Sequence, residues 1–383
     1  MPPRPEVMLI VETSMIYGRE VLRGINRYVV THQPWSLSLE PQDLMVAPPA
    51  WLDSWDGGVI SRSTTPWLAE KLQHLQIPTV DLTDIYTRTP FPHIWTDHHQ
   101  VGRLAASHLL ERGFRHFAFC GFAQHEWSSR RHGGFREAIG QAGLDCAYDE
   151  SPWATSGDYS WEEQQEQLAV WIQSLPKPVG VMACNDRRGQ QVLDACRRIE
   201  VAVPEEVAVI GVDNDELLCD LCDPPLSSVV PNAERVGYEA AALLDRLMRG
   251  ETLEQSEWLI EPLGIITRQS TDVLAIDDRQ VASAVRFIRE HACEGIGVDD
   301  VLRHVPLSRS VLERRFRKYL KRSPQIEIRS VQMKRVKQLL AETDLPLERI
   351  ASLAGFEHPE YMSVVFKRET GQTPGQYRRA TQV

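Results

Sequence analysis

The sequence predicts an α/β body followed by an all-α C-terminal domain that contains two helix-turn-helix elements. Up to about residue 270, strand-length apolar runs alternate with helical patterns, which is typical of parallel sheets covered by helices on both faces. From residue 281 only helical spacing remains. There the chain twice repeats a short helix, a tight turn and a second helix with a strong start signal. A helix presented in this way fits the major groove of DNA.

The body begins with an apolar run at 7–11, and the segment 19–29 then places Val21, Ile25 and Val29 on one helical face. The same alternation continues along the body, and because about 270 residues are too many for one compact sheet, we expect two lobes. Predicted strands are 7–11, 57–60, 78–82, 93–97, 117–121, 179–184, 207–212 and 258–263. Predicted helices are 19–29, 66–75, 100–112, 131–142, 159–174, 187–199 and 233–249.

A polar stretch at 268–272 ends the body, and a helix is predicted at 281–291. We therefore divide the chain into a two-lobed domain at 1–270, a linker at 271–280 and a helical domain at 281–383.

In the helical domain, start signals mark the second helix of each helix-turn-helix copy. Ser308 is a good N-cap in the first copy. In the second, Pro359 takes the first helical position, where its missing N–H costs nothing. A helix at 325–341 joins the copies. The buried stripes are expected at Leu312, Phe316 and Leu320 in the first copy and at Met362 and Phe366 in the second.

A chain of 383 residues with 42% apolar and 25% charged residues is ordinary for two or three globular domains. No apolar run approaches the roughly 18 residues of a membrane span, and the N-terminus lacks a signal-peptide layout. We expect a cytoplasmic protein with no membrane partner. Seven scattered cysteines argue against a disulfide framework. Cys219 and Cys222 could form a metal or redox site, but reduced, partly buried thiols are favoured, so no metal and no cofactor are expected.

Charge is distributed unevenly along the chain. Residues 279–383 hold 20 Lys and Arg against 12 Asp and Glu, a net charge of +8, whereas residues 1–278 carry −19. A basic domain on an acidic body indicates a polyanionic partner for the C-terminal domain only.

The buried stripes leave other side chains facing outward, where they could read DNA. Arg can pair bidentately with guanine, Glu can accept from cytosine, and Val can touch a thymine methyl group. A plain helical bundle with a solvated basic face is the alternative. The candidate DNA-binding residues are Arg309, Ser310, Glu313, Arg314 and Arg317 in the first copy, and Pro359, Glu360, Ser363, Val364 and Lys367 in the second.

Residues 280–383 resemble the DNA-binding domain of AraC-family transcription regulators. The matching segments are 308–316, 350–356, Phe366-Lys367 and the spacing of Gly371, Pro374, Tyr377 and Arg378. The resemblance implies double-stranded operator or promoter DNA as a partner, with RNA polymerase as a further one. One departure is the first turn, His304-Val305-Pro306, where the family usually has a glycine.

Residues 6–268 resemble the sugar-sensing domain of LacI-type repressors and the related periplasmic sugar-binding proteins. The resemblance implies a two-lobed, periplasmic-binding-protein-like fold with a sugar held between the lobes. It rests on the joint order of segments at 96–117, 131–135, 185–186, 211–215, 225–229 and 237–241.

A sugar must exchange water for carboxylate, amide and Arg partners, which such folds supply at the ends of strands in a cleft. Asp213 follows one apolar strand and could accept from two hydroxyls. Asn185 follows another strand, and Arg131 could donate to sugar oxygens. The candidate sugar-binding residues are Asp213, Asn185, Arg131, Tyr17, Trp127 and Asp97, of which Tyr17 or Trp127 could stack on the ring.

Each of these residues also has a purely structural interpretation. Asp213 could cap a turn, and Asp97 the helix that follows it. Asn185 could cap the helix at 187–199, although Asp186 is the better candidate for that cap. Arg131 could pair with an acid such as Glu126. Tyr17 and Trp127 could belong to the core or to the rim of the cleft.

A LacI-type sensor placed before an AraC-type reader resembles the xylose-responsive operon activators. The resemblance implies a sugar-responsive activator that senses a pentose, D-xylose first, and works as a homodimer. After the strand at 57–60, however, Ser61-Arg62 stands where an acidic residue is expected for a xylose reader. Another pentose, or another small ligand, therefore stays open. An enzyme acting on a small sugar is the third hypothesis, but no phosphate loop or nucleophile elbow is present.

Overall fold

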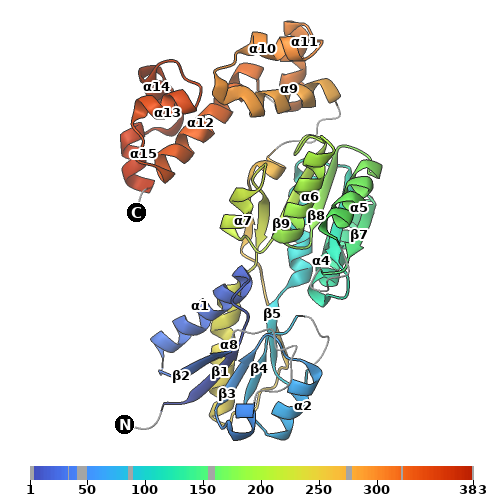
Figure 1. Cartoon of the computed structure of the whole chain (residues 1–383), viewed down its shortest axis with the longest axis vertical. Helices are drawn as coiled ribbons and strands as arrows, with labels where there is room; N and C mark the ends of the chain where they lie inside the picture. The colour runs from blue at the N-terminus through green and yellow to red at the C-terminus, as the bar shows by residue number, and fades with distance from the viewer. Residues whose placement is uncertain are drawn as a thin grey trace. The chain divides into compact units, whose positions relative to one another are not determined.

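The computed structural model describes residues 4–32, 34–40, 50–84, 89–153, 160–272, 278–320 and 322–381. The chain forms two compact units, Met1–Asp272 and Val273–Val383, which are drawn in Figure 1. Of the predicted linker, residues 273–277 lie outside the described residues, as does residue 159 at the start of a predicted helix.

The first lobe of the α/β unit is built on a sheet with strand order β11-β5-β4-β3-β1-β2, in which neighbouring strands run parallel. Helices α1 (Ile16–Thr31) and α8 (Ala233–Met248) cover one face, and α2 (Pro66–His74) covers the other (Figure 1). Their apolar side chains pack against the sheet. The strands are β1 (Glu6–Ile10), β2 (Ser36–Glu40), β3 (Gly58–Ser61), β4 (Thr79–Asp81), β5 (His93–Thr96) and β11 (Glu257–Ile260).

The second lobe has strand order β12-β10-β9-β8-β6-β7, with β12 antiparallel to β10 and the other neighbours parallel. Alternate side chains of β6 pack on α5 (Trp161–Ser174) and α6 (Asp186–Arg198) or, on the opposite face, on Phe135 of α4. The helices on that opposite face are α3 (His98–Glu111) and α4 (Glu126–Gln141). The strands are β6 (His116–Phe122), β7 (Cys146–Ser151), β8 (Val179–Ala183), β9 (Val207–Val212), β10 (Ser227–Val230) and β12 (Gly264–Ile266).

The predicted strands and helices of the body are confirmed, and four strands were missed. β2, β7 and β12 are edge strands with mostly exposed or half-buried side chains, so they lack an apolar run. β10 is buried, but its first two residues are serines. The short helix α7 (Glu216–Leu221) was missed as well. The strand predicted at 258–263 ends at Ile260, where the chain leaves the first lobe.

The chain passes between the lobes after β5, after β10 and after β11. The passing segments run side by side, because the Asp97 N–H donates to the Ile260 carbonyl at 2.8 Å and the Leu263 N–H donates to the Val230 carbonyl at 2.9 Å. Connecting segments of this kind are where two lobes can hinge.

Helices α3 and α4 approach each other unusually closely because glycines face the partner backbone. A Cβ atom on Gly102 would lie 2.1 Å from the Arg131 carbonyl oxygen, and one on Gly134 would lie 1.9 Å from the His99 carbonyl oxygen. Both distances are far inside van der Waals contact. The close crossing brings the first turn of α3 against the first half of α4, which positions His98 beside Arg131.

The C-terminal unit is helical throughout its described residues. The second helix-turn-helix copy packs on α12 through a core that includes Val336, Ile350, Met362 and Phe366. No helix among the described residues is long and apolar enough to cross a membrane. The helices are α9 (Arg279–His291), α10 (Val298–His304), α11 (Arg309–Leu320), α12 (Pro324–Glu342), α13 (Leu347–Leu353), α14 (Pro359–Thr370) and α15 (Pro374–Thr381), the last of which was not predicted.

Candidate functional site

The cleft is the boundary between the two lobes, where polar residues follow the carboxyl ends of strands. Glu12 follows β1, Arg62 follows β3 and Asp84 follows β4 in the first lobe. In the second lobe, Asn185 follows β8 and Asp213 follows β9. Ligands of parallel α/β folds bind at this edge of the sheet.

Arg131 is the most connected side chain of the cleft, and it is only 3% exposed. Its Nη2 donates to Asp213 Oδ1 at 3.3 Å, and its Nη1 donates to the Cys184 carbonyl at 2.5 Å. The guanidinium carbon lies 4.9 Å from the centre of the Trp127 ring. The alternative that Arg131 pairs with Glu126 is wrong, because the neighbouring Arg130 makes that pair at 2.8 Å.

His98 completes the surroundings of Arg131 from the first turn of α3. Its Nδ1 accepts from Arg131 Nε at 3.3 Å. Burial lowers the pKa of His98 well below its usual value, and the positive charge of Arg131 acts in the same direction. The ring is therefore neutral, with Nδ1 as the acceptor and Nε2 carrying the proton.

Asp213 stands at the end of β9 in a conformation that side chains rarely adopt, with a φ of 106°. Burial raises the pKa of Asp213, and Arg131 opposes the rise. The cap of the following helix α7 is Asp215, whose side chain accepts from the Leu218 N–H. Asp213 is thus not that cap, and the strained backbone turns its carboxylate toward Arg131.

Asn185 is the N-cap of α6, since its Oδ1 accepts from the Arg188 N–H at 2.9 Å. The expectation that Asp186 makes this cap is wrong. Asp186 instead accepts from the Asp215 N–H at 2.8 Å and from the Ser228 hydroxyl at 2.6 Å, which fixes the loop that carries Asp213.

Arg62 is the centre of the first lobe's side of the cleft. It pairs with Glu12 and, at 2.9 Å, with Asp84. Burial lowers the pKa of Arg62, but Asp84 and Glu12 outweigh this effect and hold the pKa well above its usual value. Carboxylates from the ends of the two neighbouring strands thus surround Arg62, which stands where an acidic residue was expected.

Tyr17 lies beneath Arg62, whose guanidinium carbon is 4.6 Å from the centre of the ring. The Tyr17 hydroxyl is 2.9 Å from Thr96 Oγ1, and the side chain is buried. Burial raises the pKa of Tyr17 to about 12, against the opposing effect of Arg62. The phenol is thus a neutral hydrogen-bonding group at the wall of the cleft.

Trp127 forms the aromatic part of the opposite wall. Its backbone N–H donates to the Asp84 carbonyl at 3.3 Å, which connects the second lobe to the first. Trp153 packs edge-on against it, with ring centres 6.1 Å apart. Aromatic faces of this kind suit the apolar face of a sugar ring.

Asp97, by contrast, does not join this cluster in the structure. Its side chain accepts from the Gln100 N–H at 2.9 Å and caps α3. The structure thus assigns Asp97 to the helix cap, which was the alternative interpretation.

Several buried polar atoms of the cleft have no hydrogen-bond partner among the described residues. Buried polar groups nearly always find a protein or water partner. Such a concentration therefore marks a place for a hydrogen-bonding ligand. These atoms are Ser61 Oγ, Arg62 Nε, His98 Nε2 and His125 Nδ1.

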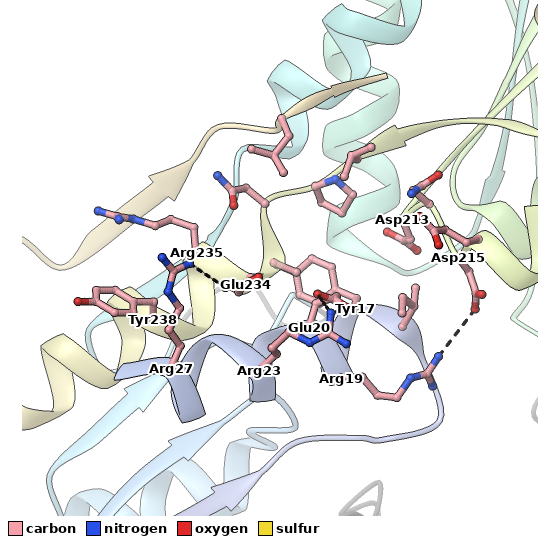
Figure 2. A pocket seen from close by; sticks show the side chains of 18 of the residues that line it. Tyr17, Arg19, Glu20, Arg23, Arg27, Asp213, Asp215, Glu234, Arg235 and Tyr238 are labelled. Atoms are coloured by element: carbon pink, nitrogen blue, oxygen red, sulfur yellow. Dashed lines mark hydrogen bonds and ion pairs between the residues drawn. The ribbon is translucent and has the colours of Figure 1, made fainter. Parts of the chain in front are cut away.

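A groove of about 950 Å³ leads to this cluster, and both Tyr17 and Asp213 line it. Figure 2 shows the arginines of α1 along one wall and Asp213 and Asp215 on the opposite side. The arginine charges are largely matched by acids. The pairs are Arg23 with Glu20, Arg27 with Glu234 and, at 4.0 Å, Arg19 with Asp215.

The first reading helix, α11, begins at Arg309 directly after Ser308, and its predicted buried stripe of Leu312, Phe316 and Leu320 is confirmed. The outward side chains Ser310, Arg314 and Arg317 are exposed, and Glu313 is half-buried. Arg309 is also exposed, but its guanidinium is engaged with Asp299 at 2.6 Å.

The second reading helix, α14, begins at Pro359 and buries Met362 and Phe366 as predicted. Glu360, Val364 and Lys367 are exposed, while the Ser363 hydroxyl donates to the Pro359 carbonyl at 2.9 Å. An exposed tyrosine, Tyr361, was not predicted on this face.

The two turns of the reading elements differ in geometry. In the second, Gly355 has a φ of +73° and the Phe356 N–H donates to the Ala351 carbonyl, which closes the end of α13. In the first, α10 ends at the extended residue Val305, and the Leu307 N–H donates to the Val305 carbonyl. The turn without glycine is therefore made with an extended residue in place of a left-handed one.

Comparisons with known proteins cover both units. A periplasmic binding protein-like domain matches residues 106–271, and a helix-turn-helix domain matches residues 301–380. The xylose operon regulatory protein of Haemophilus influenzae is 33% identical, over 97% of this chain and 98% of that protein. The protein of the same name from Escherichia coli K12 is 31% identical over 98% and 97%.

This chain belongs to the family of xylose operon regulatory proteins. A solved structure described as the xylose-binding transcription activator xylR agrees with the fold, at a TM-score of 0.84, 30% identity and full coverage of both chains. The predicted combination of a LacI-type sensing domain and an AraC-type helix-turn-helix domain in one chain is confirmed. The relatives are transcription regulators, so the protein is a sugar-sensing, DNA-binding regulator and the enzyme hypothesis is rejected.

Proposed function

We propose that this regulator binds a pentose, D-xylose first, in the interlobe cleft and activates genes of xylose use in the cytoplasm. The observation that carries the effector class is the pairing of charges in the cleft. Arg62 is matched by Glu12 and Asp84, and Arg131 by Asp213. With no unmatched cation among these residues, the cleft favours a neutral polyhydroxyl ligand over a sugar phosphate.

In this proposal the residues of the cleft take separate roles. Asp213 accepts from two adjacent hydroxyls, and Arg131 and the Nε2–H of His98 donate to sugar oxygens. Asn185 contributes its amide group beside the cap that it forms. The ring of the sugar stacks on Trp127 or Tyr17. Asp97 caps α3 through Oδ1, as Asn185 caps α6, and its contact with the sugar stays a prediction.

The choice of D-xylose is supported by the names of the two relatives and by the similarity to a solved activator that is described as xylose-binding. Ser61 and Arg62 support the alternative of another pentose, because they replace an expected acid beside the cleft. Calorimetric titration with D-xylose, L-arabinose, D-ribose and D-xylose 5-phosphate separates these possibilities. Heat of binding only from the phosphate ester would refute the charge argument.

We further propose that sugar binding closes the lobes about the three passing segments and that two protomers bind DNA as a homodimer. The helices α11 and α14 of each protomer would then enter successive major grooves. Closure would change how the two protomers present these helices, and RNA polymerase would be recruited at the promoter. Sedimentation of the protein with and without promoter DNA tests the homodimer.

A further inference from the structure

The reading face of α14 carries an exposed apolar patch that distinguishes it from α11. Among the described residues of the C-terminal unit, the large apolar side chains with high exposure are Ile326, Tyr361 and Val364, at 56%, 53% and 65%. Tyr361 and Val364 are three residues apart on α14, so they are neighbours on its surface. The exposed positions of α11 are instead serine and arginines or lysine.

The aromatic member of this patch is held in place by the joining helix α12. The Arg329 guanidinium carbon lies 5.1 Å from the centre of the Tyr361 ring and 4.7 Å from that of Phe356. Arg329 Nη2 also donates to the Tyr361 hydroxyl at 3.4 Å. Ile326 precedes Arg329 by one turn on the same face of α12. A side chain fixed in this way loses little conformational freedom when it contacts a partner.

The charges around the patch indicate what kind of partner it meets. Lys367 and Arg368 are exposed on α14 beyond Val364, and Arg329 borders Tyr361. Glu357, Glu360 and Glu369 are exposed as well, but residues 279–383 as a whole carry a net charge of +8. A partner that fits both features is a polyanion that also presents apolar groups. In the major groove of DNA the apolar group is the C5-methyl of thymine. The patch lies on the second helix of a helix-turn-helix element, where bases are read.

We propose that α14 recognises thymine methyl groups through Tyr361 and Val364, so that the half-site read by the second element is thymine-rich. The half-site read by α11 would instead depend on hydrogen bonds from Arg314 and Glu313. This inference rests on DNA binding by the helix-turn-helix unit and names the chemistry that its second half reads.

The test begins with selection of duplexes from a randomised pool by the full-length protein. Thymines in the selected duplex are then replaced, one at a time, by deoxyuridine, which removes only the methyl group. We expect about fourfold weaker binding for each contacted methyl, clustered at one half-site. If every deoxyuridine duplex binds like its parent, the proposal is wrong. If no duplex is selected at all, DNA binding itself fails, which is a different result.

Substitutions assign the effect to the patch. Val364→Ala should weaken binding to the thymine duplex several-fold. It should also reduce the ratio between the affinities for the thymine duplex and for the deoxyuridine duplex. Tyr361→Phe keeps the ring and should retain that ratio, whereas Tyr361→Ala should reduce it. Val170→Ala is the matched control, because this valine is 63% exposed on α5 of the sensing unit. A variant that keeps the ratio but loses promoter activation would show that the patch contacts a protein, which overturns the proposal.

Discussion

Arg131 of α4 and Asp213 at the end of β9 form an ion pair of 3.3 Å inside the cleft. Burial alone raises the pKa of Asp213, and Arg131 counteracts this rise. The pair therefore presents a fixed acceptor beside a fixed donor, which is the arrangement that two adjacent sugar hydroxyls require.

Asp213→Asn keeps the shape of the side chain but removes the charge that faces Arg131. We expect the affinity for D-xylose to fall about 10- to 100-fold, the loss typical of a hydrogen bond to a charged group. Binding to DNA without sugar should be retained. Isothermal titration calorimetry measures the change. Asp194→Asn, which alters a carboxylate paired with Arg197 on the exposed side of α6, is the control. An unchanged affinity in Asp213→Asn would mean that Asp213 does not bind the sugar.

The close crossing of α3 and α4 provides a second prediction. Gly134→Ala would place a Cβ atom 1.9 Å from the His99 carbonyl oxygen, so the helices must separate. We expect a loss of about 1–3 kcal/mol in the free energy of unfolding, with weaker sugar binding because His98 leaves Arg131. Gly133→Ala is a neighbouring control, since its nearest atom would be 3.9 Å away. Thermal melting of both variants measures the difference, and equal melting temperatures would contradict the account.

The pH dependence of stability follows from His108. Burial lowers the pKa of His108 from 6.5 to about 3, and Arg112 acts in the same direction. Below pH 6.5 the unfolded chain therefore binds more protons than the folded one. Stability is full above this pH and falls as the pH drops toward 3. We expect His108 to lower the melting temperature between pH 7 and pH 5, while burial of Asp186, which raises the pKa of that carboxyl to about 8, acts in the opposite direction over this range.

His108→Gln should make that fall shallower, because glutamine can still bond to Thr271 but does not titrate. Burial also lowers the pKa of His98, His125 and His132, so part of the slope should remain. Melting curves followed by circular dichroism at several pH values measure the slope. If the variant and the wild type had the same slope, His108 would not contribute to the pH dependence of the melting temperature.

The last prediction concerns the first reading helix. Arg314 is exposed, and Arg314→Ala should cost roughly 1–3 kcal/mol of DNA binding and relax base preference at one position. Arg309→Ala should cost less, because that guanidinium is already engaged with Asp299. Competition binding with base-substituted duplexes at one salt concentration measures both. Equal losses from the two variants, or no change in base preference for Arg314→Ala, would be inconsistent with these roles.

Most strands with a buried apolar run could be predicted from the sequence, and β11 could be predicted from Trp258, Leu259 and Ile260 although it lies at a sheet edge. The strands that supply Asp213 and Asn185 are fully buried, so the positions of these residues at strand ends followed directly. The side chains of edge strands such as β2 are mostly exposed, so the sequence has no buried apolar run there. Asp84 was missed although it follows β4 as Asp213 follows β9, so the same signal could have found it.

Pairings between distant residues depend on the tertiary structure. The sequence offered Glu126, five residues earlier, as a partner for Arg131. In the helix Arg130 has the i,i+4 spacing to Glu126, and Arg131 turns inward to Asp213. The exchange of roles between Asn185 and Asp186 has the same cause, because Asp186 meets Ser228 and Asp215 only once β8, β9 and β10 have joined one sheet.

The central claim is that a pentose in the cleft controls DNA binding by the C-terminal unit. Fluorescence anisotropy of a labelled promoter duplex, titrated with the full-length protein at one salt concentration with and without D-xylose, tests it most directly. At a D-xylose concentration close to the Kd of the wild type, the account predicts that the sugar shifts the DNA-binding curve of the wild type and leaves that of the weaker-binding Asp213→Asn nearly unchanged. Identical curves for the wild type with and without the sugar, or an equal shift in Asp213→Asn, would contradict it.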